Sequence, residues 1–365
     1  KLLKIQFRLG MFDPQDKVPY SKIGAEVLES KPHQQQALKM ARQSMVLLKN
    51  EKQLLPLSSK IKKIALLGPN ANNGTTQLGN YNGIPSKNAT LLDALRAEKG
   101  IEVVYDSISD FITLQPGIDL QHYAEKYKDV DLIIYAGGIS ALLEGEEGDT
   151  GNVEGFYRGD RTTINLPAVQ TQVMQMLQKS GKPMIFICMS GSAIAFNWES
   201  QHIPAIIQAW YGGQAAGTAL ADILFGRYNP SGKLPITFYR SDSDLPAIED
   251  YSMKNRTYRY FNGDVLYPFG YGLSFTKFKF KKLNVPQEVQ IGDTINISTE
   301  VVNTGKSAGE EVIQLYLSHK DIPPEAPNSQ LVGFQKVMLQ PGERKIVHFK
   351  LSPRNLAYVD ETGGV

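Results

Sequence analysis

The sequence has 365 residues, a length that at about 150 residues per domain predicts two or three domains. Hydrophobic residues make up 42% and charged residues 21%, so the composition is neither disordered nor fibrous. Lys and Arg number 39 against 37 Asp and Glu, and this small net charge of +2 argues against binding to a nucleic-acid backbone. The single cysteine, Cys188, excludes an internal disulfide scaffold, and no apolar run reaches the length of about 18 residues that predicts a membrane span.

The N-terminal residues 1–32 show no sustained hydrophobic period and are predicted to form a linker. Apolar side chains then recur at helical spacing, which predicts a helix over residues 33–49. Continuous apolar runs of the kind found in parallel strands buried on both faces follow, at residues 64–68, 102–105, 131–136, 184–189 and 205–210. Helical patterns alternate with them, at residues 90–98, 120–127, 167–179 and 214–225. The alternation predicts a doubly wound, mostly parallel α/β sandwich domain over residues 33–240.

The pattern changes twice after residue 240. Residues 241–276 are rich in Tyr, Arg and Gly and are predicted to form a strap packed between domains. Short alternating runs separated by turn signals follow, at residues 295–302, 312–317, 331–338 and 346–351. They predict a fibronectin-III-like β-sandwich over residues 277–365, and because about six strands fit, we expect this domain to be cut short.

The loop after the third buried strand carries the strongest chemical signal. Four carboxylates fall within six residues of it, at Glu144, Glu146, Glu147 and Asp149. Crowding and partial desolvation are expected to raise the pKa of at least one of these carboxyls, which is what a general acid near neutral pH requires. A solvated acidic face and a calcium site are the alternatives, although the spacing is not that of an EF-hand.

Two other loops at strand ends could contact a ligand. In Asn80-Tyr81-Asn82 an aromatic ring is flanked by amides, as suits a sugar face and its hydroxyls, and a plain turn is the alternative. Trp210-Tyr211 ends the fifth strand and is interpreted first as a hinge before a helix and second as the rim of a cleft. The five histidines lack metal-ligand spacing and Ser192 lacks a Gly-x-Ser-x-Gly elbow, so neither a metal, a cofactor nor a serine nucleophile is predicted.

Several motifs resemble one family. The segments that carry the resemblance are Ser44 to Asn50, Leu54 to Leu57, Ile64 to Ala71, Gly159-Asp160-Arg161, Gly226 to Pro235 and Tyr267 to Leu273. Together they resemble the C-terminal part of glycoside hydrolase family 3, and residues 80–83 with the 144–147 loop look most like its β-xylosidase branch. The C-terminal sandwich is similar to the fibronectin-III-like domain of many members.

The resemblance implies retaining hydrolysis of a terminal β-linked xylose or glucose from oligosaccharides, without a cofactor. In that family the nucleophile is an aspartate of an N-terminal (β/α)₈ barrel, and the acid/base is a glutamate in a loop of the following domain. Glu146 matches that acid/base best, with Glu144 and Glu147 as alternatives, and Asn80, Tyr81 and Asn82 match substrate-binding positions.

The barrel is missing from this sequence. We therefore expect the chain to need the N-terminal barrel of the same enzyme as its partner and to be inactive alone. The family also implies a secreted or periplasmic location, although no signal peptide is visible. A non-catalytic carbohydrate-binding or structural module is the alternative function. A receiver-like signalling domain is disfavoured, because the first strand ends in Gly-Pro-Asn rather than in acidic residues.

Overall fold

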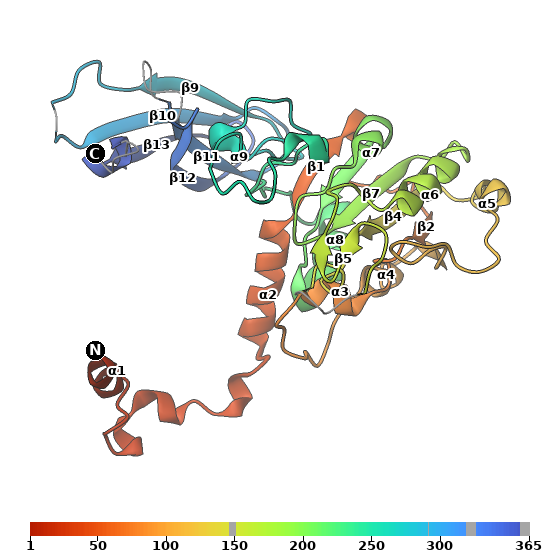
Figure 1. The fold of residues 1–365 in the computed structure, drawn as a ribbon, viewed down its shortest axis with the longest axis horizontal. Helices are drawn as coiled ribbons and strands as arrows, with labels where there is room; N and C mark the ends of the chain where they lie inside the picture. The colour runs from red at the N-terminus through yellow and green to blue at the C-terminus, as the bar shows by residue number, and fades with distance from the viewer. Residues whose placement is uncertain (146–150, 291, 319–325, 358–365) are drawn as a thin grey trace.

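The computed structural model describes residues 1–145, 151–290, 292–318 and 326–357. Its largest element is a six-stranded sheet with the order β1-β8-β7-β4-β2-β3 (Figure 1). β1 is antiparallel to β8, and the other strands run parallel to one another. The strands are β1 (Val46–Asn50), β2 (Lys63–Leu67), β3 (Glu102–Asp106), β4 (Leu132–Gly138), β7 (Met184–Met189) and β8 (Ala205–Gln208).

Helices cover both faces of this sheet, because every central strand is apolar on both sides. In β2, Ala65 and Leu67 pack in the core beneath α5 and α6, whereas Ile64 and Leu66 pack beneath α2, α4 and α8. The helices are α2 (Lys31–Ser44), α4 (Leu91–Arg96), α5 (Leu120–Lys126), α6 (Ala168–Gln178) and α8 (Ala216–Leu224). The predicted doubly wound, mostly parallel α/β fold is confirmed.

Shorter elements connect the strands and helices of this layer. They are η4 (Glu51–Gln53), α3 (Gly74–Leu78), β5 (Phe156–Tyr157), β6 (Asp160–Arg161), α7 (Asn197–His202), η5 (Gly213–Ala215) and η6 (Asp242–Asp244). The β5–β6 pair lies between β4 and α6 in the chain and is antiparallel.

The prediction of one helix over residues 33–49 is wrong at its C-terminal end. The helix α2 ends at Ser44, and the next residues form the edge strand β1. Val46 and Leu48 point into one core and Leu47 into the other, so a short apolar run satisfies the strand period as well as the helix period. Pairing with β8 selects the strand, a tertiary contact that local periodicity does not reveal.

The C-terminal region folds as antiparallel sheets with their own apolar core. A three-stranded sheet has the order β13-β10-β9, and β11 pairs with β12. The strands are β9 (Phe278–Asn284), β10 (Ile295–Asn303), β11 (Gly309–Leu317), β12 (Gln330–Leu339) and β13 (Arg344–Leu351), followed by α10 (Pro353–Leu356). The predicted sandwich is confirmed, but the sequence does not predict β9, because the alternation in this lysine-rich edge strand covers only four residues, and of its side chains only Phe278 is partly buried.

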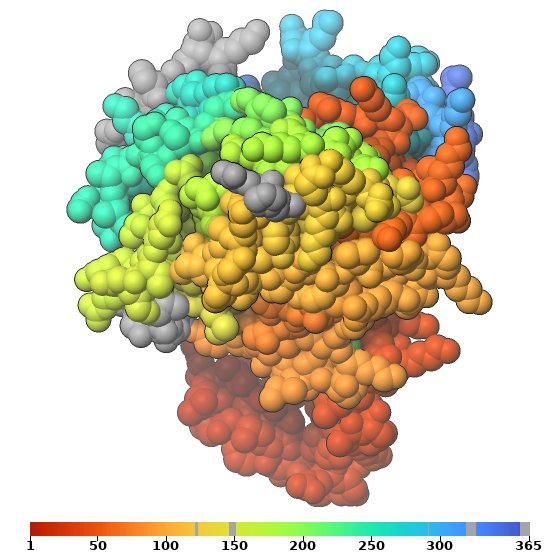
Figure 2. All heavy atoms as spheres, turned by 90° about the vertical axis from the view of Figure 1, so that its right-hand side faces the viewer, coloured from red at the N-terminus to blue at the C-terminus, as the bar shows by residue number. Residues whose placement is uncertain are grey.

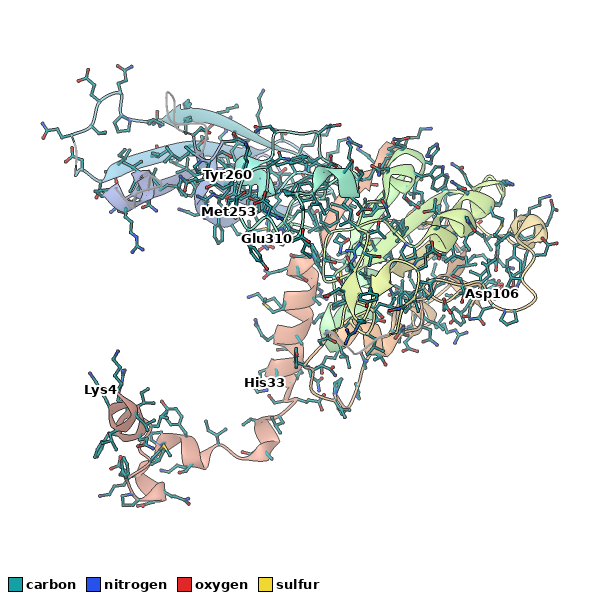
Figure 3. The ribbon with its side chains drawn as sticks, in the orientation of Figure 1. Lys4, His33, Asp106, Met253, Tyr260 and Glu310 are labelled. Atoms are coloured by element: carbon teal, nitrogen blue, oxygen red, sulfur yellow. The ribbon has the colours of Figure 1, made fainter. Side chains whose placement is uncertain are left out.

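Residues 228–231, which follow α8, join the α/β domain to the β-sandwich. The side-chain amide of Asn229 donates to the carbonyl oxygen of Ala308 at 2.9 Å. The hydroxyls of Tyr228 and Ser231 both donate to the carboxylate of Glu310, at 3.0 and 3.1 Å, and Glu310 is labelled in Figure 3. These hydrogen bonds make the segment a fixed connection between the two regions.

The aromatic residues that follow also pack between the two regions. The ring of Tyr258, in α9 (Thr257–Tyr260), stacks on Phe269 with centroids 4.0 Å apart and an interplanar angle of 11°. Tyr316 of β11 meets the Tyr258 ring edge-on at 6.1 Å. Two rings of the segment, Tyr258 and Phe269, thus contact Tyr316 of the β-sandwich, and the role of residues 241–276 as a strap between domains stays a prediction.

The N-terminal segment extends away from the rest of the chain (Figures 1 and 2, red). None of residues 1–30 is buried. Its elements are α1 (Leu2–Arg8), η1 (Gln15–Lys17), η2 (Pro19–Lys22) and η3 (Ala25–Val27). The sequence does not predict α1, because its apolar residues show no helical stripe that is separate from the polar ones.

Candidate functional site

The candidate site lies at the carboxyl ends of the parallel strands of the six-stranded sheet. In open α/β sheets ligands bind outside the carboxyl ends of the strands, where the following loops meet. Three such loops converge here: the loop after β4 supplies Glu144, the loop after β7 supplies Gly191 and Ser192, and the loop after β8 supplies Tyr211.

The half-buried Glu144 carboxylate is the centre of this cluster. Its Oε1 accepts hydrogen bonds from the Gly191 amide at 2.7 Å and from the Tyr211 hydroxyl at 2.5 Å. Its Oε2 accepts from the Ser192 hydroxyl. Three donors, from the loops after β7 and β8, therefore hold the Glu144 carboxylate, which belongs to the loop after β4.

Arg161 supplies positive charge behind the cluster. Its Nη1 donates to Ser192 Oγ at 2.7 Å and to the Ala193 carbonyl at 2.8 Å. Burial lowers the pKa of Arg161, and the nearby Glu144 charge opposes that effect. Its Nη2 is buried without a hydrogen-bond partner among the described residues, so the guanidinium has the two N–H donors of Nη2 left for a group from outside them.

Tyr211 acts as a hydrogen-bond donor. Burial, together with the adjacent Glu144 carboxylate, raises the pKa of its hydroxyl well above the ordinary tyrosine value. The preceding Trp210 has a φ of 58°, in the left-handed region that few non-glycine residues adopt. Its indole donates to the Ser44 carbonyl at 3.1 Å and so helps to hold this turn of the chain.

A close approach of strands supports the base of the β4 loop. Gly138, the last residue of β4, has a φ of 108°, and a Cβ built there would lie 2.0 Å from the Met189 carbonyl oxygen of β7. The Gln170 side chain of α6 brackets the same residue: it accepts from the Gly138 amide at 2.8 Å and donates to the Gly138 carbonyl at 2.7 Å. The point where the loop leaves the sheet is thus fixed on two sides.

The predicted acid/base, Glu146, and the alternative Glu147 lie outside the described residues. Of the predicted catalytic candidates, the described part of the chain contains Glu144, and its role as acid or base stays a prediction. Asn80, Tyr81 and Asn82 are exposed, with 88% of Tyr81 accessible.

The predicted sugar-binding loop nevertheless begins beside the Glu144 cluster. A Cβ built on Gly79 would lie 3.6 Å from the Cβ of Tyr211. The start of the Asn80-Tyr81-Asn82 loop and the cluster therefore belong to the same part of the molecular surface. Substrate binding by these three residues remains a prediction.

Ser192, Tyr211 and Arg161 are the site residues that sequence reasoning missed. The sequence raises Ser192 only as a possible nucleophile, and for Tyr211 it favours a hinge over the rim of a cleft. The available signal was position: Ser192 and Tyr211 both follow buried strands, whose carboxyl ends meet at one edge. Which hydroxyl contacts which carboxylate depends on loop conformation, so the sequence does not reveal it.

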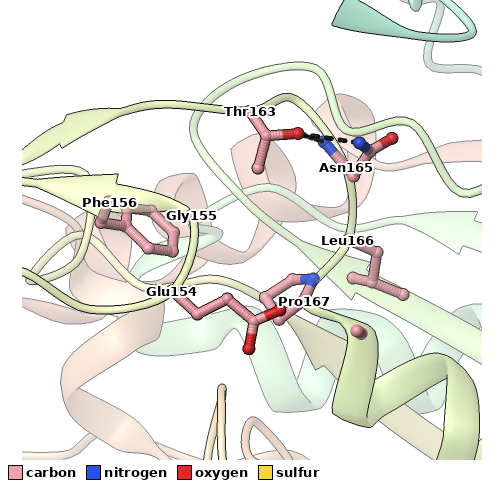
Figure 4. Close-up of a pocket in the computed structure, with 8 residues that line it drawn as sticks. Glu154, Gly155, Phe156, Thr163, Asn165, Leu166 and Pro167 are labelled. Carbon is pink, nitrogen blue, oxygen red and sulfur yellow. Dashed lines mark hydrogen bonds between the residues drawn. The ribbon is translucent and has the colours of Figure 1, made fainter.

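A small cavity lies next to the β5–β6 pair (Figure 4). Its volume is about 200 Å³, and its lining includes Glu154, Phe156, Thr163, Asn165 and Pro167. The Thr163 hydroxyl accepts from the Asn165 side-chain amide at 2.8 Å.

Within the described ranges no group of three or more His, Cys, Asp or Glu side chains could hold a metal ion. The described helices include none that is long and apolar enough to cross a bilayer.

Two family models match the chain. The Glycosyl hydrolase family 3 C-terminal domain matches residues 45–275, and the Fibronectin type III-like domain matches residues 311–365. The first match covers more than half of the chain and includes the whole six-stranded sheet with the Glu144 cluster.

Curated relatives match along nearly the full chain. A Xylan 1,4-beta-xylosidase from Xylanibacter ruminicola is 32% identical over 99% of this chain and 58% of that protein. A Periplasmic beta-glucosidase from Salmonella typhimurium is 32% identical over 98% of this chain and 50% of that protein. The chain therefore spans about half the length of the curated relatives it matches.

Solved structures agree with these relatives. A β-glucosidase from Erythrobacter marinus superposes with a TM-score of 0.81 and 31% identity, covering 97% of this chain and 50% of that one. Family-model coverage, sequence identity and fold thus agree, and the chain belongs to glycosyl hydrolase family 3, with that family's C-terminal domain followed by a fibronectin type III-like domain.

Proposed function

We propose that this chain is the C-terminal half of a retaining exo-β-glycosidase that removes terminal β-linked xylose or glucose from oligosaccharides. The observation that carries the proposal is coverage. Relatives named as a β-xylosidase and a β-glucosidase match 98–99% of this chain, and the chain accounts for 50–58% of their length. The rest of such an enzyme would be a (β/α)₈ barrel that carries the aspartate nucleophile.

In this proposal the loop after β4 supplies the general acid/base, with Glu146 as the proton donor. A retaining glycosidase needs two carboxyl groups about 5–5.5 Å apart, one to attack the anomeric carbon and one to protonate the departing oxygen. The same acid then acts as a base and removes a proton from the water that releases the sugar. The carboxyl end of β4 suits this role, because in open α/β sheets ligands bind outside the carboxyl ends of the strands.

The remaining assignments follow from the same proposal. Residues 1–32 would link the barrel to the α/β domain of residues 33–240, and residues 241–276 would strap that domain to the β-sandwich of residues 277–365. Asn80, Tyr81 and Asn82 would contact the sugar near the Glu144 cluster. Because the Salmonella relative is named periplasmic, we propose export from the cytoplasm.

The test compares the 365-residue chain with a longer polypeptide in which a barrel precedes it. We expect the longer protein to hydrolyse an aryl β-xyloside or β-glucoside, and the chain alone to be at least about 10³-fold slower, since it lacks a nucleophile. Turnover is measured by release of the aryl alcohol at matched protein concentrations. Comparable rates for both proteins would contradict the proposal, and sugar binding without any role in turnover would favour a binding module.

A further inference from the structure

We propose that Glu144 is a positioning residue, which as a carboxylate fixes the start of the loop that carries Glu146. This inference rests on the proposed function, because it assigns Glu144 a role that acts through the acid/base. It also separates Glu144 from the two other glutamates that the sequence offers as the acid.

The direction of each hydrogen bond indicates that Glu144 accepts rather than donates. The Gly191 amide can only donate, and it lies 2.7 Å from Glu144 Oε1. Ser192 Oγ already accepts from Arg161, so its own proton is directed at Glu144 Oε2. Tyr211 donates its hydroxyl proton at 2.5 Å, and its raised pKa keeps that proton in place. All three partners donate to Glu144, so none of these hydrogen bonds is one in which Glu144 donates a proton.

The charge around Glu144 supports the same conclusion. Arg161, Ser192 and Glu144 form a chain in which a cation donates to a hydroxyl and the hydroxyl donates to the carboxylate. Hydrogen bonds that end on a charged group are about twice as strong as neutral ones, and a chain of them polarises each member. An ionised Glu144 therefore ties the β4 loop to the ends of β7 and β8.

The shape of the site requires close contact at this point. A Cβ on residue 191 would lie 3.1 Å from Glu144 Oε1 and 3.1 Å from Tyr211 Cε2, so glycine there leaves room for both groups. Glu146 follows Glu144 by two positions in the sequence, and two residues of chain span at most about 7 Å. An error of about 1 Å in the placement of a catalytic group can cost about 100-fold in rate.

The first test is a cycle of glutamine variants in the longer polypeptide: Glu144→Gln, Glu146→Gln and the double variant. We expect Glu144→Gln to lower kcat/KM for an alkyl glycoside by about 10- to 100-fold. For a dinitrophenyl glycoside, whose departure needs no proton, we expect a loss below about threefold. When Glu144→Gln is added to the Glu146→Gln variant, kcat/KM for the alkyl glycoside should fall by less than about twofold. The acid that Glu144 positions is then already absent.

Glu125→Gln is the matched control, because Glu125 is exposed on α5 and pairs with Lys128 on the same surface. It should leave both substrates and the melting temperature unchanged. The inference is overturned if Glu144→Gln leaves the alkyl substrate unaffected, or if it costs the same factor with and without Glu146. Inactivity of the unsubstituted longer polypeptide toward every β-glycoside would instead count against the proposed function.

A second readout does not depend on activity. Hydrogen–deuterium exchange of the peptide over residues 139–145 should become at least about tenfold faster in Glu144→Gln and stay unchanged in Glu125→Gln, because local opening sets the exchange rate. Unchanged exchange in Glu144→Gln would also overturn the inference, whatever the enzyme assay shows.

Discussion

Glu146→Gln in the longer polypeptide is expected to lower kcat/KM for an alkyl β-glycoside by about 10²- to 10⁴-fold, the range of general acid catalysis. This loss corresponds to about 3–5 kcal/mol of transition-state stabilisation. Glutamine keeps the shape of the side chain but has no acidic proton for the departing oxygen. A dinitrophenyl glycoside leaves without protonation, so its kcat/KM should fall by less than about tenfold.

Initial rates over a series of leaving groups give the comparison directly. In the variant, the logarithm of kcat/KM should fall steeply as the pKa of the leaving alcohol rises, and in the unsubstituted enzyme the slope should be shallow. Glu147→Gln is the neighbouring control and should keep the shallow slope. Equal losses for good and poor leaving groups in Glu146→Gln would end its assignment as the acid.

Gly138→Ala is expected to have the largest effect on stability, with a loss of more than about 4 kcal/mol or failure to fold. Its Cβ would lie 2.0 Å from the Met189 carbonyl oxygen, and Gly138 pairs with Met189 between the two central strands. Neither backbone can move without breaking that pairing. Urea unfolding followed by circular dichroism measures the loss.

Gly117→Ala provides the matched comparison. Gly117 also has a positive φ, of 80°, but nothing lies within 4 Å of a Cβ built there. That variant should lose only about 1–2 kcal/mol, which is the cost of the left-handed backbone conformation alone. Equal losses in the two variants would show that the close approach of β4 and β7 contributes nothing.

The architecture was largely predictable because its signals are local. Runs such as Ile64 to Leu67 are apolar on both faces, and they predict covered parallel strands without any knowledge of their neighbours. The error at the end of α2 concerns a segment whose structure depends on a partner far along the chain, whereas β9 pairs with the next strand, β10. Leu47 could belong to a helix or a strand until β8 pairs with it, and in β9 the alternation of Phe and Lys is broken at Lys282 after four residues.

The candidate site was predictable as a location but not as a set of contacts. A loop of carboxylates after a buried strand points to the carboxyl edge of the sheet, and the structure places Glu144 there. The partners of Glu144 come from residues 47, 48 and 67 positions away in the sequence. No spacing rule relates them, since they meet only through the strand order of the sheet.

Azide trapping with Glu146→Ala in the longer polypeptide is the most direct test of the assignment on which this account depends. When the base is missing, water attacks the glycosyl–enzyme slowly, whereas azide needs no base: it forms a bond to the anomeric carbon and releases the aspartate carboxylate. With a dinitrophenyl β-glycoside we predict that azide raises the variant's kcat by at least about tenfold and yields the β-glycosyl azide, the product of two inversions. The absence of any azide effect in Glu146→Ala, or the same azide product from Glu144→Ala instead, would contradict the account.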